Sequence, residues 1–275
     1  MTRGIFSCFG RPSFLASPHS SSSSSSSSAT ADETPEEPGL CGPVVVELFS
    51  SQGCAASPVA ELLVSRLGRG DFKLEMPVVV LAYHVDYWDY AGWKDPFGSS
   101  LWTVRQKAYV EALRLAMILT PQVVVQGRAH CVGNDEEALL AAVQGAPRFP
   151  ALAFQATFTK SEHQTLQVTL TGSMRTKTGS DEANVMVALY ENGLVTDCPS
   201  RENKGKVLSN DYVVRKLEKL CTVKDIIGKK SVTQTVDFGL WEGFNSSKCG
   251  ISVLVQNNEH HIFGSQNFKL PENLS

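Results

Sequence analysis

The chain has 275 residues, of which 25 are Lys or Arg and 28 are Asp or Glu, giving a formal net charge of −3 with histidine neutral. This balance excludes the overall excess of basic residues that is typical of nucleic-acid-binding domains. No apolar stretch approaches the roughly 18 to 20 residues that a membrane span requires, so we expect a soluble protein. The length favours about two domains of roughly 100 to 200 residues each.

Residues 1–40 are predicted to be a disordered, serine-rich leader outside the fold. The nine consecutive serines from Ser20 to Ser28 bury too little apolar surface to offset the entropy of ordering them. The segment also has arginines and no acidic residue before Asp32, which is the composition of an organelle transit peptide. The segment is therefore expected to be either a plain disordered tail or a plastid transit peptide.

Residues 41–147 alternate between buried strands and amphipathic helices. Strands are expected at 44–49, 78–83 and 123–126, and helices at about 57–68, at 100–117 and from Asp135. The first helix is expected to end at Gly68. The apolar positions expected to face the core are Val59, Leu62, Leu63 and Leu67 in the first helix, and Val104, Ala108, Leu113 and Met117 in the second. This β-α-β-α-β-α order predicts an α/β sheet with its site at the carboxyl ends of the strands.

Residues 148–275 replace the helical period with alternation of apolar and polar residues. The alternation is clear at 166–170, 185–189, 232–236 and 251–255, and residues 211–220 fit either a strand or a short helix. Short strands separated by turn residues are typical of an antiparallel β-sandwich. We therefore expect an all-β, sandwich-like second domain.

Seven cysteines are scattered along the chain, and none has the C-x2-C spacing of structural zinc sites. Their odd number and wide spacing argue against a secreted disulfide scaffold and favour a reducing intracellular compartment, the cytoplasm unless the leader is a plastid address. Cys54 is predicted to lie where a buried strand passes through a loop into a helix. The helix start favours an anion there, which makes Cys54 the candidate nucleophile, whereas a structural cysteine would be a small buried hydrophobe.

Ser57 and Pro58 follow Cys54, and Thr120 and Pro121 precede a later strand. Ser57 lies about one helical turn from Cys54 and is placed to donate a hydrogen bond to its sulfur. Pro121 cannot donate to a sheet ladder, so it belongs at a strand entrance, where a cis peptide is one way to make the bend.

A strand, a Cys-x-x-[Cys/Ser]-Pro motif at a helix start and a Thr-Pro pair before a later strand resemble the thioredoxin superfamily. The segments 45–54, 84–97, 105–109, 120–122 and 127–128 are similar, in the same order, to the motifs of one uncharacterised branch, a domain of unknown function in bacteria and plants. Segments 191–193 and 213–215 resemble its downstream part. The resemblance implies a thioredoxin-like first domain with thiol chemistry at Cys54.

This chain departs from its bacterial relatives at Ser57, where they typically carry a second cysteine. A mixed disulfide at Cys54 then needs an external thiol, such as glutathione, or another cysteine of the chain to release it. Cys41 and Cys131 are the candidates within the chain. The resemblance therefore implies a monothiol mechanism, in which either glutathione as a co-substrate or another cysteine of the chain resolves the mixed disulfide, and no other cofactor is expected.

Glu47 stands within an otherwise apolar strand, where a carboxylate is costly to bury unless it is paired or protonated. Thioredoxins are similar in placing an acidic residue beneath the active-site cysteine as a proton acceptor. The alternatives are a general base for Cys54 and a carboxylate at the sheet edge paired with Lys or Arg.

The loop from His84 to Phe97 combines one imidazole, several carboxylates and four large aromatic rings. Alternation along the strand is expected to place His84 and Asp86 on one face, where the pair orders the pocket or tunes the thiolate. Trp88 and Trp93 are expected to wall the pocket around Cys54. The alternatives are a rigid surface loop and a divalent metal site on the imidazole and the carboxylates, although no H-x-x-x-H pair supports a metal.

Three functions follow from these residues. The first is a thiol/disulfide oxidoreductase that acts on protein thiols or glutathione, with Cys54, Ser57, Pro121 and Glu47 in catalysis and Thr120, His84, Asp86, Trp88 and Trp93 in binding. The second is a redox-inactive protein-binding module. The third is a metal-dependent hydrolase built on His84, Asp86 and Asp89.

Overall fold

The computed structural model describes residues 41–161, 164–174 and 182–274. The predicted leader at 1–40 lies outside these residues. Three α-helices form within the described ranges: α1 (Ser57–Arg69), α2 (Ser100–Ala112) and α3 (Glu136–Gln144). Single 3-10 turns form at Asp89–Ala91, Val223–Asp225 and Ser246–Lys248. No helix in these ranges is both long and apolar enough to span a membrane.

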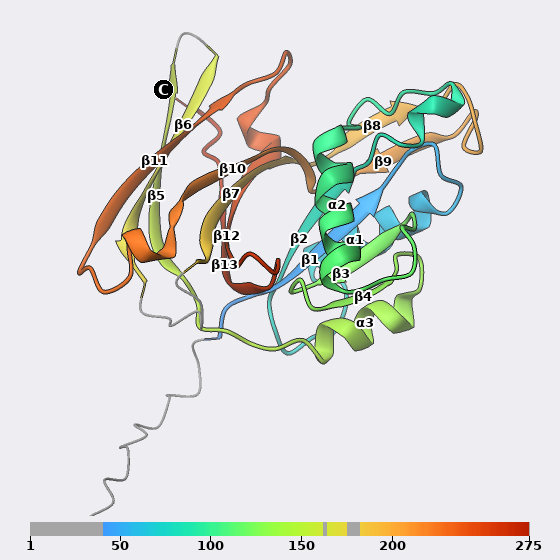
Figure 1. Ribbon diagram of the computed structural model, residues 1–275. Helices are drawn as coiled ribbons and strands as arrows, with labels where there is room; N and C mark the ends of the chain where they lie inside the picture. Colours follow the sequence, from blue (N-terminus) through green and yellow to red (C-terminus); the bar gives the residue numbers. More distant parts are fainter. Residues whose placement is uncertain (1–40, 162–163, 175–181, 275) are drawn as a thin grey trace, which may run out of the picture. The chain divides into compact units, whose positions relative to one another are not determined.

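Most of the remaining structure is β-strand. The strands are β1 (Val44–Ser50), β2 (Val78–His84), β3 (Gln122–Val125), β4 (Ala129–Val132), β5 (Ala153–Ser161), β6 (Thr165–Ser173), β7 (Asn184–Glu191), β8 (Leu194–Asp197), β9 (Val207–Asn210), β10 (Val213–Thr222), β11 (Val232–Gly239), β12 (Cys249–Gln256) and β13 (Ile262–Lys269). The protein is therefore a strand-rich, mixed α/β structure (Figure 1).

The largest sheet has eight strands in the order β13-β12-β7-β10-β2-β1-β3-β4. The β1–β2 pair is parallel and runs in step from Val44 opposite Val78 to Ser50 opposite His84. This register brings the carboxyl ends of both strands to one edge, where the candidate site residues follow. The β2–β10 pair is also parallel, whereas β3 runs antiparallel to β1.

Alternation along β1 and β2 divides the core into two layers. Even-numbered residues such as Val46, Leu48 and Val80 pack with α1 and α3, whereas odd-numbered residues such as Val45, Phe49 and Tyr83 pack with Trp102 and Tyr109 of α2. Helices thus cover both faces of this part of the sheet. That arrangement explains why β1 is a continuous apolar run, interrupted only by Glu47.

Two of the expected helix faces were right only in part, with Leu63 and Leu67 buried as expected. In α1, Val59 and Leu62 are more than half exposed, and the buried apolar positions are Ala60, Leu63, Val64 and Leu67. In α2, which ends at Ala112, Val104 is 64% exposed, and the buried side chains are Trp102, Thr103, Gln106 and Tyr109. Polar side chains face inward on α2 because they bond to residues of other segments beneath the helix, such as Asp86, Gln122 and Glu47. A pattern of apolar residues alone does not reveal these contacts.

The end of α1 also differs from the expected one. The helix continues through Gly68 and is capped by Gly70, which has a positive φ of 81°. Gly68 instead serves close packing, since a Cβ atom there would lie 2.5 Å from the ring of Tyr212.

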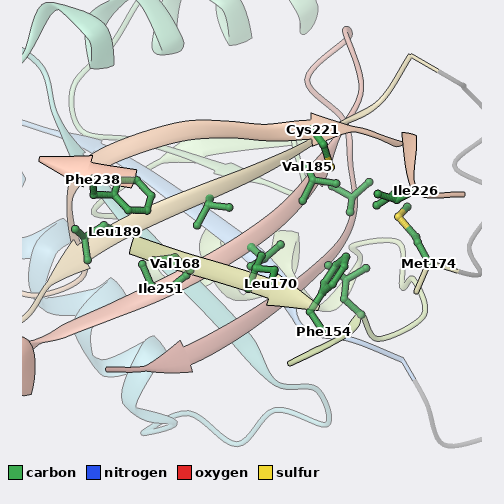
Figure 2. Close-up of a cluster of buried hydrophobic side chains, with 14 of the residues drawn as sticks. Phe154, Val168, Leu170, Met174, Val185, Leu189, Cys221, Ile226, Phe238 and Ile251 are labelled. Carbon is green, nitrogen blue, oxygen red and sulfur yellow. The ribbon is translucent and has the colours of Figure 1, made fainter. Parts of the chain in front are cut away.

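A second core forms where the three-stranded sheet β11-β6-β5 packs against β7 and β12 of the large sheet. Figure 2 shows side chains of this core. Val168, Leu170 and Phe238 come from β6 and β11, and Val185, Leu189 and Ile251 come from β7 and β12. The predicted strands at 166–170, 185–189, 232–236 and 251–255 all form, and 211–220 lies mostly within β10. The strands assigned to a separate sandwich are thus divided between two sheets.

The expected boundary near residue 147 does not interrupt the large sheet. β10 lies between β7 and β2, and the backbone N–H of Ala82 donates to the carbonyl of Tyr212 at 2.8 Å. The described residues from position 41 onward form one compact unit. Residues from after position 180 therefore reach the end of the sheet where Cys54 lies.

Candidate functional site

Cys54 lies in the tight loop that joins β1 to α1. Its backbone N–H donates to the carbonyl of Ser51 at 3.1 Å, and its own carbonyl accepts from the N–H of Ser57 at 3.3 Å. The N-cap of α1 is Ala56, so Cys54 lies two residues before the N-cap and outside the first turn of the helix. The helix dipole acts mainly within the first turn, so its effect on Cys54 is weaker than the sequence predicts.

The thiol of Cys54 faces the segment before β3. Its Sγ donates to the carbonyl oxygen of Thr120 at 3.4 Å, and the Thr120–Pro121 peptide is cis. The side-chain oxygen of Thr120 is hydrogen-bonded to the hydroxyl of Tyr87, which also donates to Gln106 Oε1 at 3.1 Å. The structure therefore brings Cys54, Thr120 and Pro121 together, and only 5% of Cys54 is exposed.

Ser57 is buried at the first residue of α1. Its Oγ accepts the backbone N–H of Ser51 at 3.3 Å. The hydroxyl thus braces the loop that carries Cys54, a different contact from the hydrogen bond to sulfur that the sequence predicts.

Side chains from distant segments hold the same loop in place. Asn203, in the hairpin between β8 and β9, donates through Nδ2 to the carbonyls of Gln52 and Cys54, both at 2.9 Å. The side chain of Gln52 donates to Asn210 Oδ1 at 2.9 Å. Asn203 and Asn210 are both buried, so the loop is fixed by satisfied polar contacts beneath the surface.

Glu47 is fully buried and paired with an arginine. Its Oε1 lies 2.7 Å from Arg105 Nη2 and accepts from Arg105 Nε at 2.8 Å, and its Oε2 accepts from the hydroxyl of Tyr109. These contacts are on the α2 face of the sheet. They match the alternative of a carboxylate paired with a basic residue, although in a central strand rather than at an edge.

His84 forms the centre of a buried charge cluster at the end of β2. Its Nδ1 lies 2.8 Å from Asp95 Oδ2, and its Nε2 lies 3.3 Å from Glu61 Oε1 of α1. Burial alone would lower the pKa of His84, but the charges of Asp95 and Glu61 outweigh it and raise the pKa to about 10. His84 is therefore positively charged at neutral pH.

Asp95 links this cluster to the loop before Cys54. Its Oδ2 accepts the backbone N–H of Gln52 at 2.7 Å, and its Oδ1 accepts that of Phe97 at 2.9 Å. Burial opposes ionisation, but the charge of His84 and these hydrogen bonds hold the pKa of Asp95 below its ordinary value. The carboxylate is thus a fixed anion that ties His84 to the backbone beside Cys54.

Asp86 does not pair with His84. The strand ends at His84, and the Asp86 carboxylate turns toward α2, where it accepts from Thr103 Oγ1 at 2.6 Å. Within the ranges that the structure describes, no three His, Cys, Asp or Glu side chains are placed to hold a metal ion together.

Trp88 and Trp93 lie half-buried in the loop after β2. Trp88 packs against the Cys54 loop, since a Cβ atom on Gly53 would lie 3.3 Å from Trp88 Cβ. In the described part of the chain, neither buried indole N–H has a hydrogen-bond partner. Trp88 therefore borders the Cys54 loop, whereas Trp93 belongs to the same aromatic loop farther along the chain.

Sequence reasoning missed Glu61, Asn203 and Asn210. Glu61 had a signal, because it lies four residues after Ser57 and so on the same face of α1. The two asparagines had none, because they reach the site through a hairpin about 150 residues away along the chain. Cys41 and Cys131 are respectively exposed and half-buried, and burial raises the pKa of the Cys131 thiol to about 11.

Two solved structures are similar to this chain. A protein of Agrobacterium tumefaciens, whose crystal structure comes from a structural genomics consortium, is similar at 28% identity and a TM-score of 0.54, over 84% of this chain and 96% of that one. HBP35 of Porphyromonas gingivalis shares the fold at 15% identity and a TM-score of 0.59, over 86% of this chain and 77% of that one. No curated protein matches the sequence.

The profile of a family described as "Protein of unknown function (DUF1223)" matches residues 45–256. The match begins in β1 and ends at the last residue of β12, so it includes the Cys54 loop, the His84 cluster and the β8–β9 hairpin. Since it covers more than three quarters of the sequence, the chain belongs to the DUF1223 family.

Proposed function

We propose that the chain is a thioredoxin-like monothiol oxidoreductase in which Cys54 is the nucleophile. The observation that carries the proposal is the position of the Cys54 thiol, at a strand–helix junction and 3.4 Å from the carbonyl of Thr120, directly before Pro121. The order of these parts is similar to that of the thioredoxin superfamily. Trp88 beside the loop and the Thr120 backbone are the surfaces that would position a substrate.

The reaction is thiol–disulfide exchange. The Cys54 thiolate attacks one sulfur of a disulfide, the other sulfur leaves as a thiolate, and a mixed disulfide remains on Cys54. Ser57 cannot resolve that bond, so glutathione attacks it as an external thiolate, regenerates Cys54 and leaves in a new disulfide. The Asp95–His84 pair positions the loop through Gln52, and Ser57 does so through Ser51.

A redox-inactive binding module is the second candidate. It is favoured by the burial of Cys54, which is 5% exposed, and by the engagement of the Ser57 hydroxyl with the backbone. In this alternative the loop after β2 presents its aromatic rings to a protein partner, and Cys54 is a packing residue.

Treatment of the folded protein with oxidised glutathione, followed by mass spectrometry of the cysteine peptides, separates the two candidates. We expect a glutathionyl adduct on Cys54 that reduced glutathione removes. Cys249 is an internal control because it is equally exposed, at 5%, and burial raises the pKa of its thiol to about 12. It should stay unmodified at neutral pH.

A Cys54→Ser variant should lose the adduct and keep the fold, as judged by circular dichroism. If Cys54 reacts only after unfolding in urea, at the same rate as Cys249, the oxidoreductase proposal fails and the binding module stands.

A further inference from the structure

A cavity of about 300 Å³ lies between α1 and the strand β9. One wall is a single face of α1, formed by side chains spaced four residues apart: Ser57, Glu61, Ser65 and Arg69. The opposite wall is the segment from Val207 to Asp211, and the inner end is the backbone that leaves β1 at Ser50. Cys54 does not line this cavity, although Gln52 and Ser57 of its loop do, so the cavity adjoins the thiol site without containing the thiol.

The buried charges beside the inner end of the cavity are more negative than positive, with Glu61 in its lining and Asp95 and His84 behind it. Glu61 and Asp95 are both buried, and they share a single buried cation, His84. The arginine of the lining, Arg69, lies at the outer end. It forms ion pairs with Asp71 at 3.1 Å and Asp211 at 3.6 Å, and it donates a hydrogen bond to Ser65. One carboxylate charge beside the cavity therefore lacks a partner of its own among the described residues.

Unused hydrogen-bonding atoms gather at the same end. Among the described residues, Oε1 of Glu61 has only the ion pair with His84 Nε2 at 3.3 Å, and its Oε2 has no hydrogen-bond partner. Oε1 of Gln52 and the hydroxyl of Ser50 also have no partner in these ranges. These three side chains are 3%, 2% and 0% exposed, and all of them line the cavity. The side-chain amide nitrogen of Gln52 donates to Asn210 Oδ1, whereas the side-chain amide oxygen of Gln52 remains free. Buried polar groups are rarely left unsatisfied in native proteins, so the cavity is built for a partner.

We propose that this cavity binds the ammonium group of a small hydroxylated or aliphatic amine. An ammonium donates three hydrogen bonds, which suits an end supplied with acceptors, and its charge neutralises the carboxylate of Glu61. The remaining lining has hydroxyl and amide groups at Ser209 and Asn210 and apolar side chains at Leu62 and Leu208, which suit a short, partly hydroxylated body. The volume is at the lower limit of small-molecule sites, which run from about 300 to 1,000 Å³.

Isothermal titration calorimetry with three amines tests the proposal, using ethanolamine, putrescine and glucosamine as the probes. Each has a neutral counterpart of matched shape: ethylene glycol, 1,4-butanediol and glucose. We expect at least one amine to bind with a Kd below about 1 mM and its counterpart to bind at least about tenfold more weakly. No binding by any of the three amines, or equal binding of amine and counterpart, overturns the proposal.

Two variants assign the binding to this cavity. Glu61→Gln keeps the shape but removes the charge, and it should weaken amine binding at least about tenfold. Glu137→Gln, an exposed residue of α3, is the matched control and should bind as the parent does. Leu62→Trp fills the cavity from a side chain that is 58% exposed, and it should block binding even if Glu61→Gln does not fold. Unchanged affinity in Leu62→Trp overturns the assignment.

Discussion

At the scale of single residues, His84 carries a positive charge where water does not reach it. The charge persists because Asp95 and Glu61 lie on opposite sides of the ring, at 2.8 Å and 3.3 Å. A charge in such a place is costly unless carboxylates compensate for it, so removal of its proton must affect folding. The cluster therefore makes stability depend on pH.

The free energy of unfolding should fall as the pH rises from about 6.5 toward 10. The pKa of His84 is about 10 in the folded protein and about 6.5 in an unfolded chain, so the folded state binds one more proton over this range. The stabilisation is complete below pH 6.5 and is lost through pH 10, with a slope that one proton limits to about 1.4 kcal/mol per pH unit. Asp95, whose pKa is lowered, instead loses its contribution in acid.

Urea denaturation at pH 7, 8 and 9 measures this slope. His84→Gln should flatten it by about one proton, whereas His130→Gln, an exposed residue of β4, should leave it unchanged. Parallel pH profiles for the parent and His84→Gln would show that His84 is not protonated in the folded protein.

The sequence predicts a chemically dense loop at His84, and the residue does lie at a charged cluster. It does not predict the partners. Alternation suggested Asp86, but β2 ends at His84, so the following residue positions no longer obey strand periodicity and Asp86 turns to Thr103. The actual partner, Asp95, comes from the far side of a loop. The path of that loop depends on the hydrogen bonds that the Asp95 carboxylate accepts from the backbone of Gln52 and Phe97.

At the scale of elements, the β8–β9 hairpin is hydrogen-bonded to the loop that carries Cys54. Asn203 donates to two carbonyl groups of that loop, and loss of these hydrogen bonds leaves buried acceptors unsatisfied at a cost of about 1–3 kcal/mol each. The loop should then open more often. We expect Asn203→Ala to raise the rate at which iodoacetamide alkylates Cys54 by at least about fivefold.

Mass spectrometry of the Cys54 peptide over a time course measures that rate. Asn134→Ala, at an exposed asparagine, is the control for a general loss of stability, and the Cys249 peptide reports global unfolding in both variants. Equal rates in the two variants would mean that the hairpin does not hold the loop.

Elements with a strong local signal could be predicted, and those formed by distant pairing could not. β1 and β2 are long apolar runs, and α3 begins after Asp135, whose side chain accepts from the N–H of Ala138. The hairpin β8–β9 and the strand β4 have short, mostly exposed sequences without such a signal. The second helix was predicted as an element, but its inward polar face reflects contacts such as that of Gln106 with Gln122, which only the folded chain brings together.

At the scale of the whole molecule, the two halves of the sequence share one sheet and one apolar layer. β10 pairs with β2, so the second half covers an edge that the first half alone would leave open. In the layer beneath α2, Val79, Leu81 and Tyr83 pack with Tyr190 and Val214. Local periodicity describes each half well but carries no information on this pairing, which joins residues more than 100 positions apart.

We therefore expect residues 41–274 to unfold in urea as one cooperative unit. Tryptophan fluorescence can report on each half separately: Trp102 lies in the layer beneath α2, and Trp241 packs against the core drawn in Figure 2. One variant keeps Trp102 and replaces Trp88, Trp93 and Trp241 by Phe, and the other keeps only Trp241. Circular dichroism measures the overall stability of each variant, and each fluorescence midpoint is corrected for it. The two corrected midpoints should coincide, because rupture of the β2–β10 pair exposes apolar surface on both sides. Two separate transitions, with the Trp102 transition independent of the Trp241 transition, would instead support two domains that meet near residue 147.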